Sequence, residues 1–214
     1  ALLLCFCIGA KAQKYSLISP NGKLSVEVEL NQGIGVKLLN GTHEMVSLSG
    51  LTLQTNHSDP DFASFRVKKV LRNSVNETVT PVIREKSNAY ENRYNEMQIV
   101  FKSGYSIDFR LFDEGLAYRL ETSAKDSLIV LKENLNIQLE ANDSLRYQAS
   151  GSFNSSYETP YEYRRVSGLK EGQLCHLPAL VEKQNGSFLM ITEADLYNYP
   201  GLWLAGTGKA ALNG

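Results

Sequence analysis

Tyr105-Ser106-Ile107-Asp108-Phe109-Arg110-Leu111 alternates apolar and polar side chains at every position. Successive side chains of a β-strand point to opposite faces, so this period of two predicts a strand with one buried face. The turn Asp113-Glu114-Gly115 follows, and the alternation resumes over residues 116–122. Residues 105–122 are therefore predicted to form a β-hairpin with aromatic side chains on both arms.

The same period of two recurs along the chain, for example in residues 24–30. Further strands are expected at 35–39, 51–55, 66–72, 77–85, 94–102, 135–139, 145–149, 179–182 and 187–192. Gly-containing turns separate many of them, and no stretch of 12 or more residues has a clean helical period. The nearest candidate for a helix, residues 88–97, has too few apolar side chains for a core helix. We therefore predict an all-β fold, an antiparallel β-sandwich in one domain.

Composition and charge exclude several classes of protein. The 214 residues are 43% hydrophobic, enough for one substantial core, and the formal net charge is -1. Without a net basic field, neither nucleic acid nor an anionic lipid surface is an expected partner.

Residues 1–12 have the character of an export signal. An apolar run ends with small residues at Ala10 and Ala12, a spacing that predicts cleavage before Gln13. The run of about ten apolar residues is too short to span a bilayer, which needs about 20. Cys5 and Cys7 lack the small preceding residue typical of a lipid-modified cysteine. We expect a truncated signal peptide at 1–12, no membrane span, a periplasmic or secreted protein, and a mature domain at 13–214.

The chain starts at Ala1 and stops after an apolar run, so we expect it to be part of a longer protein. Removal of residues 1–12 leaves Cys175 as a lone cysteine. No internal disulfide is then expected, and the domain must be held together by packing.

Common catalytic signatures are missing from the sequence, including phosphate-binding loops, zinc motifs and nucleophile elbows. One segment that departs from the strand pattern, residues 155–165, crowds tyrosines and glutamates around Pro160, which disfavours a central strand. Tyr157 and Tyr161 could pack on sugar rings, while Glu158 and Glu162 could bind sugar hydroxyls or a hard cation. The alternative is a solvated loop whose tyrosines fold back onto the surface.

A second segment, residues 192–204, follows an apolar strand with two acids, Glu193 and Asp195, and then Tyr197 and the single Trp203. Acids at a strand end often begin a binding loop. Alternatively, the acids cap a short turn and Trp203 belongs to the core.

Four collinear stretches carry a resemblance to a known family: SPNGKLSVEVEL from residue 19, NRYNEMQIVFKSGYSIDFRLFDEGLAYRLE at 92–121, SYETPYEY at 156–163 and ITEADLYNYPGLWL at 191–204. Together they resemble the N-terminal domain of glycoside hydrolase family 97, bacterial α-glucosidases and α-galactosidases. The resemblance spans essentially the whole chain after residue 12.

This resemblance implies a β-super-sandwich of galactose mutarotase-like topology, followed in the full-length enzyme by a catalytic (β/α)₈ barrel and a small β domain. It further implies an active-site Ca²⁺ held mainly by barrel glutamates and completed by one glutamate of the sandwich. Glu158 matches that metal ligand. The expected pocket or interface residues are Tyr157, Tyr161, Glu162, Glu193, Asp195 and Tyr197. No catalytic acid, base or nucleophile is expected in this chain.

The implied partners are an α-linked oligosaccharide or α-galactoside substrate and the catalytic barrel of the same chain. Three other hypotheses stay open: a carbohydrate-binding module without a catalytic role, a free-standing sugar mutarotase using His176, and a purely structural domain.

Overall fold

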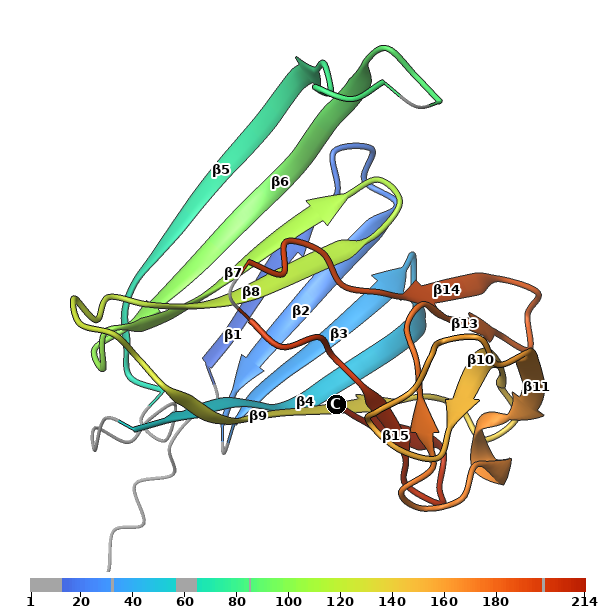
Figure 1. The fold of residues 1–214 in the computed structure, drawn as a ribbon. Helices are drawn as coiled ribbons and strands as arrows, with labels where there is room; N and C mark the ends of the chain where they lie inside the picture. The colour runs from blue at the N-terminus through green and yellow to red at the C-terminus, as the bar shows by residue number, and fades with distance from the viewer. Residues whose placement is uncertain (1–12, 32, 57–64, 85, 198) are drawn as a thin grey trace, which may run out of the picture.

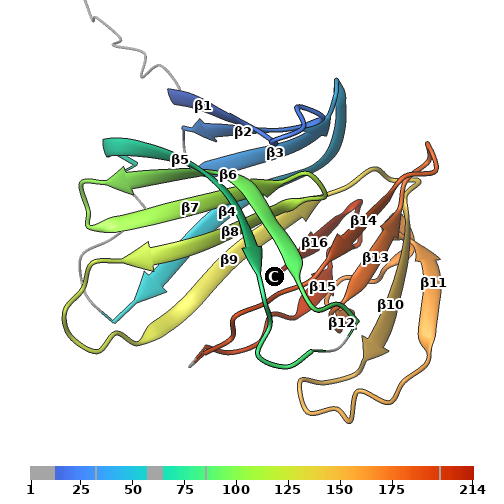
Figure 2. The same cartoon turned by 90° about the horizontal axis from the view of Figure 1, so that it is seen from above.

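Two antiparallel sheets make up the protein in a computed structural model that describes residues 13–31, 33–56, 65–84, 86–197 and 199–214. The proposed signal peptide at 1–12 lies outside these residues. Figures 1 and 2 show the smaller sheet lying over the N-terminal half of the larger one. Within the described ranges, no helix is long and apolar enough to cross a membrane.

The smaller sheet has four strands in sequence order, which are β5 (Val67–Val79), β6 (Tyr90–Phe101), β7 (Tyr105–Phe112) and β8 (Leu116–Thr122). The N-terminal half of the larger sheet contains β1 (Gln13–Ile18), β2 (Leu24–Leu30), β3 (Ile34–Asn40), β4 (His43–Thr55) and β9 (Val130–Gln138). Phe112 N donates to Gly115 O at 2.9 Å in the β7–β8 turn, which confirms the predicted hairpin.

The core lies between these sheets because the strands of each sheet turn their apolar side chains toward the other sheet. Val26 and Val28 of β2 are fully buried, as are Ile107 and Phe109 of β7. The polar residues between them face outward. This arrangement is the all-β sandwich that the period of two predicted.

The C-terminal half of the larger sheet is built from shorter strands. They are β10 (Ser144–Ser150), β11 (Tyr161–Arg165), β12 (Leu174–Cys175), β13 (Ala179–Glu182), β14 (Phe188–Ile191), β15 (Leu204–Gly206) and β16 (Ala211–Asn213). A 3₁₀ turn, Val166–Gly168, follows β11. Gly206 permits close packing here, since a Cβ atom on it would lie 2.5 Å from Lys170 O.

The sequence predicted three strands with their observed bounds, 24–30, 116–122 and 179–182. A separate strand at 77–85 is wrong. Residues 77–79 extend β5, where they pair with β6, and the chain then turns with Val82 and Ile83 exposed. Five strands were missed, namely β1, β11, β12, β15 and β16. β11 starts directly after Pro160 and pairs only with β10 among the described strands. It is therefore an edge strand, which agrees with the prediction that Pro160 disfavours a central strand here.

Candidate functional site

The loop that carries Glu158 connects β10 to β11, and its backbone is tied to β10 on both sides of this residue. Gln148 Nε2 donates to the carbonyl oxygens of Tyr157, at 3.2 Å, and Thr159, at 2.7 Å. Thr159 Oγ1 donates to Ala149 O at 3.1 Å. These bonds hold the backbone around Glu158 against the strand, so this part of the loop has a defined path.

Tyr157 has a left-handed backbone, with φ of 60°. This conformation is unfavourable for a residue with a bulky side chain. Its ring centroid lies 4.1 Å from that of His176 and 6.0 Å from that of Trp203. His176 and Trp203 are 4.3 Å apart, and Phe153 lies 5.3 Å from Trp203. Ring packing therefore compensates for the backbone strain and joins the two segments singled out by the sequence.

His176 is the buried member of this aromatic cluster, with 2% of its surface exposed. Its Nε2 lies 3.3 Å from Ser155 Oγ, and its Nδ1 has no hydrogen-bond partner within the described part of the chain. Trp203 is only half-buried and is not part of the main core, so the alternative that it is a core residue is wrong. Both rings instead support the surface loop of Tyr157.

Glu158 and Glu162 differ in what their carboxylates bind. Glu158 is exposed, and its carboxylate makes no hydrogen bond or ion pair to any residue that the structure describes. Glu162 Oε2 accepts hydrogen bonds from Arg164 Nε at 2.6 Å and from Tyr147 OH at 3.2 Å. The bond from Arg164 lowers the pKa of Glu162. Both carboxylate oxygens of Glu158 are therefore open to a ligand, whereas Oε2 of Glu162 is already engaged.

The second segment forms a closed loop between β14 and β15. Glu193 Oε2 accepts a 2.7 Å hydrogen bond from Leu202 N, which joins the two ends of the loop. Asp195 has φ of 63°, and its Oδ2 lies 3.4 Å from Arg119 Nη1 of β8. Tyr197 is 84% exposed. Tyr199 OH donates to the carboxylate of Glu133 on β9.

The predicted residues therefore divide into two groups. Glu162, Glu193 and Asp195 make contacts inside the domain, whereas Glu158 and Tyr197 point into solvent. Tyr161 is 58% exposed on β11. Across the described residues, no hydrogen bond or ion pair links the two segments, and the contact between Tyr157 and Trp203 is their link.

No set of three or more His, Cys, Asp or Glu side chains in the described ranges comes close enough to hold a metal ion. A hard cation that bound Glu158 would thus need its other ligands from outside these residues, since Ca²⁺ takes six to eight oxygens.

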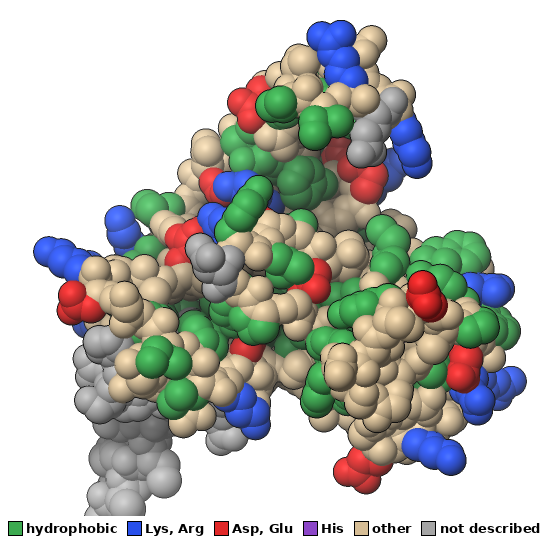
Figure 3. All heavy atoms as spheres, in the orientation of Figure 1, with side chains coloured by type: hydrophobic (Ala, Val, Ile, Leu, Met, Phe, Trp, Pro, Cys, Tyr) green, Lys and Arg blue, Asp and Glu red, His purple; other side chains and the backbone are tan. Residues whose placement is uncertain are grey.

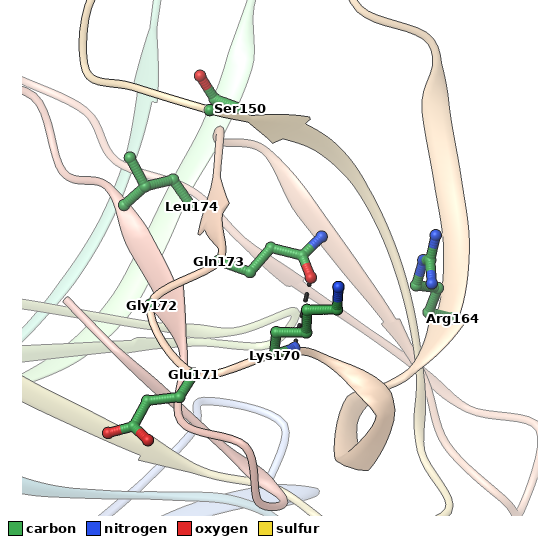
Figure 4. Close-up of a pocket in the computed structure, with 8 residues that line it drawn as sticks. Ser150, Arg164, Lys170, Glu171, Gly172, Gln173 and Leu174 are labelled. Atoms are coloured by element: carbon green, nitrogen blue, oxygen red, sulfur yellow. Dashed lines mark hydrogen bonds between the residues drawn. The ribbon is translucent and has the colours of Figure 1, made fainter.

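Described residues in the C-terminal half of the large sheet line a larger and a smaller cavity. The larger, about 450 Å³, contains none of the predicted residues. Figure 4 shows its lining loop, in which Lys170 N donates to Gln173 Oε1, with Arg164 on the neighbouring strand. The smaller, about 280 Å³, is lined by Tyr161 and Glu162 together with residues of β10, β13 and β14.

Sequence reasoning missed Gln148 and gave His176 only the mutarotase role. Gln148 lies in an ordinary strand pattern, and His176 follows a buried cysteine without any recognisable motif. Nothing in the sequence around either residue marks it as functional before the fold is known.

Comparisons with known proteins agree over nearly the whole chain. A family model described as Glycosyl-hydrolase 97 N-terminal matches residues 17–214. The chain is 28% identical over 222 residues to a retaining alpha-galactosidase of Bacteroides thetaiotaomicron, a match that covers 98% of this chain and 33% of that protein.

Two solved structures of a glycoside hydrolase family 97 enzyme from Pseudoalteromonas sp. strain K8 share the fold. The complex with acarbose has a TM-score of 0.80 and the complex with panose one of 0.79, each at 18% identity. Each match covers 92% of this chain and 31% of that enzyme. The chain thus spans about a third of the length of these relatives.

Proposed function

The chain belongs to the glycosyl-hydrolase 97 N-terminal family, and from this premise we propose that it serves a calcium-dependent, exo-acting α-glycosidase as its N-terminal sandwich. In this proposal the sandwich forms one wall of the active site and donates Glu158 to a Ca²⁺ ion. The catalytic acids lie on a barrel domain of the same protein. The substrate is an α-linked oligosaccharide or an α-galactoside.

The presentation of Glu158 carries this proposal. Its backbone is held by the two hydrogen bonds from Gln148, while its carboxylate is exposed and unpaired among the described residues. Such a side chain has lost part of its freedom before it binds and has no internal contact to give up. An exposed carboxylate is also a hard oxygen donor, the type that Ca²⁺ prefers.

The chemistry of such a site requires two domains. Glu158 would supply one ligand, and carboxylates of the catalytic part, water and a substrate hydroxyl would supply the others. The bound cation would orient sugar hydroxyls and shift the pKa values of nearby carboxyl groups. The part played by this chain is to bind and position.

The test is substitution of Glu158 in the full-length protein. Glu158→Gln should weaken calcium binding and lower turnover, while the thermal unfolding midpoint measured without calcium stays unchanged. Glu114→Gln is the matched control, because Glu114 is also exposed but lies in the β7–β8 turn. Calcium titration by calorimetry, with activity after chelation and calcium addition, gives the readout. Equal calcium affinity in the two variants would contradict the proposal.

The aromatic cluster favours a second candidate function, a carbohydrate-binding module. Phe153 and Tyr157 are 70% and 55% exposed, and such ring faces pack well on the C–H faces of sugars. Calorimetric titration of residues 13–214 with maltose and melibiose separates the candidates. Saturable binding would favour a module, whereas its absence favours a wall that needs the catalytic part.

His176 contacts no carboxylate among the described residues, so nothing observed favours a mutarotase.

We also propose that the protein is exported and cleaved before Gln13. Mass spectrometry of the protein recovered from the periplasm or medium should give an N-terminus at Gln13. An uncleaved protein in the cytoplasm would contradict this.

A further inference from the structure

Strands β11, β10, β13 and β14 form a four-strand edge of the large sheet, with one side turned away from the core. Leu145 and Tyr147 of β10 are buried, as is Val181 opposite Leu145. Their neighbours along each strand must point the other way, because side chains alternate across a strand. The pairing therefore identifies a second face of this edge.

We define this outer face by six residues that the register aligns: Tyr161 and Tyr163 on β11, Arg146 on β10, Leu180 on β13, and Phe188 and Met190 on β14. Tyr161, Tyr163, Phe188 and Met190 are each more than half exposed. Figure 3 shows hydrophobic side chains gathered over β13 and β14 at the right of the view. Isolated exposed apolar residues are ordinary, but a contiguous set on one sheet face marks an interaction surface.

The charges on the outer face compensate one another. The Arg146 guanidinium lies 4.3 Å above the Tyr163 ring, and its Nη2 lies 3.6 Å from Glu182 Oε2. Tyr163 OH donates to the same oxygen at 3.2 Å. The face therefore presents aromatic, methionine and arginine side chains without an unpaired charge, which is the composition of a protein–protein interface core.

The outer face is continuous with the segment that presents Glu158. Gln148 points to the same side as Arg146, two residues away, and it lies opposite Tyr161 in the register. Its amide holds the carbonyl groups on both sides of Glu158. Glu158 is three residues from Tyr161, so their Cα atoms are at most about 10 Å apart. Any partner that brings further metal ligands to Glu158 must approach the start of β11.

We propose that the outer face is the surface on which the catalytic part of the full-length protein docks. This inference rests on the proposed function, because it takes the occupant to be the part that shares a metal site with Glu158. The lengths agree with such an occupant. The match covers 33% of the Bacteroides thetaiotaomicron alpha-galactosidase, so the other 67% of that protein (100 − 33) has no counterpart in this chain. The docked part covers Met190 and Phe188 and adds a dry contact beside the metal ligand.

The test is oxidative footprinting of the full-length protein at its methionines. Met45 and Met97 are 7% and 0% exposed and serve as internal controls, whereas Met190 is 61% exposed in the structure. Docking should make Met190 oxidise at least about tenfold more slowly than in the same protein unfolded in urea, because a covered thioether is shielded from the oxidant. A rate within about twofold of the unfolded protein would overturn the proposal.

A second measurement separates this inference from its premise. Met190→Glu in the full-length protein should accelerate limited proteolysis between the sandwich and the remainder, because an unpaired charge opposes burial. Leu131→Glu is the matched control, since Leu131 is 59% exposed on β9. Equal proteolysis of both variants would overturn docking. Slow oxidation of Met190 that disappears on dilution would identify a second copy as the occupant and also overturn it.

Glu158→Gln should leave Met190 slow to oxidise. Loss of calcium binding with rapid oxidation of Met190 would mean that the proposed function holds and the docking inference fails. Slow oxidation of Met190 with unchanged calcium binding would mean that the docking inference holds and that Glu158 is not a metal ligand.

Discussion

The side-chain amide of Gln148 donates a 2.7 Å hydrogen bond to the carbonyl oxygen of Thr159, across the loop that carries Glu158. The same nitrogen also reaches Tyr157 O. A single strand residue thereby determines the path of the loop on both sides of the proposed metal ligand.

Gln148→Met should release this loop with little change in side-chain size. We expect the free energy of unfolding to fall by about 1–2 kcal/mol, because two hydrogen bonds are lost and the part-buried carbonyl of Thr159 loses its partner. Urea unfolding and amide hydrogen exchange at residues 155–160 are the measurements. Gln54→Met is the control, since Gln54 is exposed on β4. Unchanged exchange in the loop would contradict this role of Gln148.

The buried ion pair of Lys183 and Asp143 provides a stability prediction. Lys183 Nζ lies 2.7 Å from Asp143 Oδ2, and the two side chains are 2% and 0% exposed. Lys183→Met leaves a buried carboxylate without its cation, so the free energy of unfolding should fall by about 3–5 kcal/mol. Asp143→Asn in the Lys183→Met background should recover much of this loss. Urea denaturation of the parent protein, Lys183→Met, Asp143→Asn and the double variant completes the double-mutant cycle.

Lys37 and Glu44 form the matched surface pair, also 2.7 Å apart but with side chains 52% and 42% exposed. Lys37→Met should cost about 1 kcal/mol or less, because water screens the exposed pair. A similar loss for Lys37→Met and Lys183→Met would show that burial does not decide the strength of these pairs.

Asp108 predicts a pH dependence of stability. Burial and the neighbouring carboxylate of Glu121 raise the pKa of Asp108 to about 6. The folded protein therefore holds a proton that the unfolded chain has lost, and stability falls as the pH rises from about 4 to about 6. Asp108→Asn should be more stable than the parent protein at pH 7 by about 1 kcal/mol, with allowance for solvent screening, and should lose this advantage below about pH 4. Urea unfolding at both pH values, with exposed Asp126→Asn as the control, decides the point.

Cys175 should be inert in the folded protein. Its side chain is fully buried, and burial raises the pKa of its thiol to about 12. Since the thiolate is the reactive form, a thiol reagent at pH 8 should modify Cys175 only after unfolding. Absorbance with Ellman's reagent, on residues 13–214 with and without urea, is the measurement. Rapid reaction of the native protein would show that the C-terminal half opens readily.

The strands of the sandwich could be predicted from the sequence because each buries one face. Residues 24–30 and 116–122 show this alternation, and the structure gives them the same bounds. β12 and β15 contain only two and three residues, too few for any period to appear. β11 was missed because its tyrosines and charges all look solvated, although its pairing with β10 makes it a strand.

The candidate site was only partly predictable, for a related reason. The sequence distinguished the residue types at 155–165 and 192–204, but it could not separate a free carboxylate from an engaged one. Glu158 and Glu162 occupy similar sequence surroundings, yet Arg164 and Tyr147 bind only Glu162. These partners come together through strand pairing and the direction of each side chain.

By itself, the sequence determined the all-β class, the positions of the main strands along the chain and the family, because local alternation and turn residues act over a few neighbouring positions. Only the tertiary structure decided which acid stays unpaired, which rings support Tyr157, and which tyrosines share an outer face with Met190. Those relationships depend on the register between strands far apart in the chain, where a shift of one residue would turn every side chain to the opposite face.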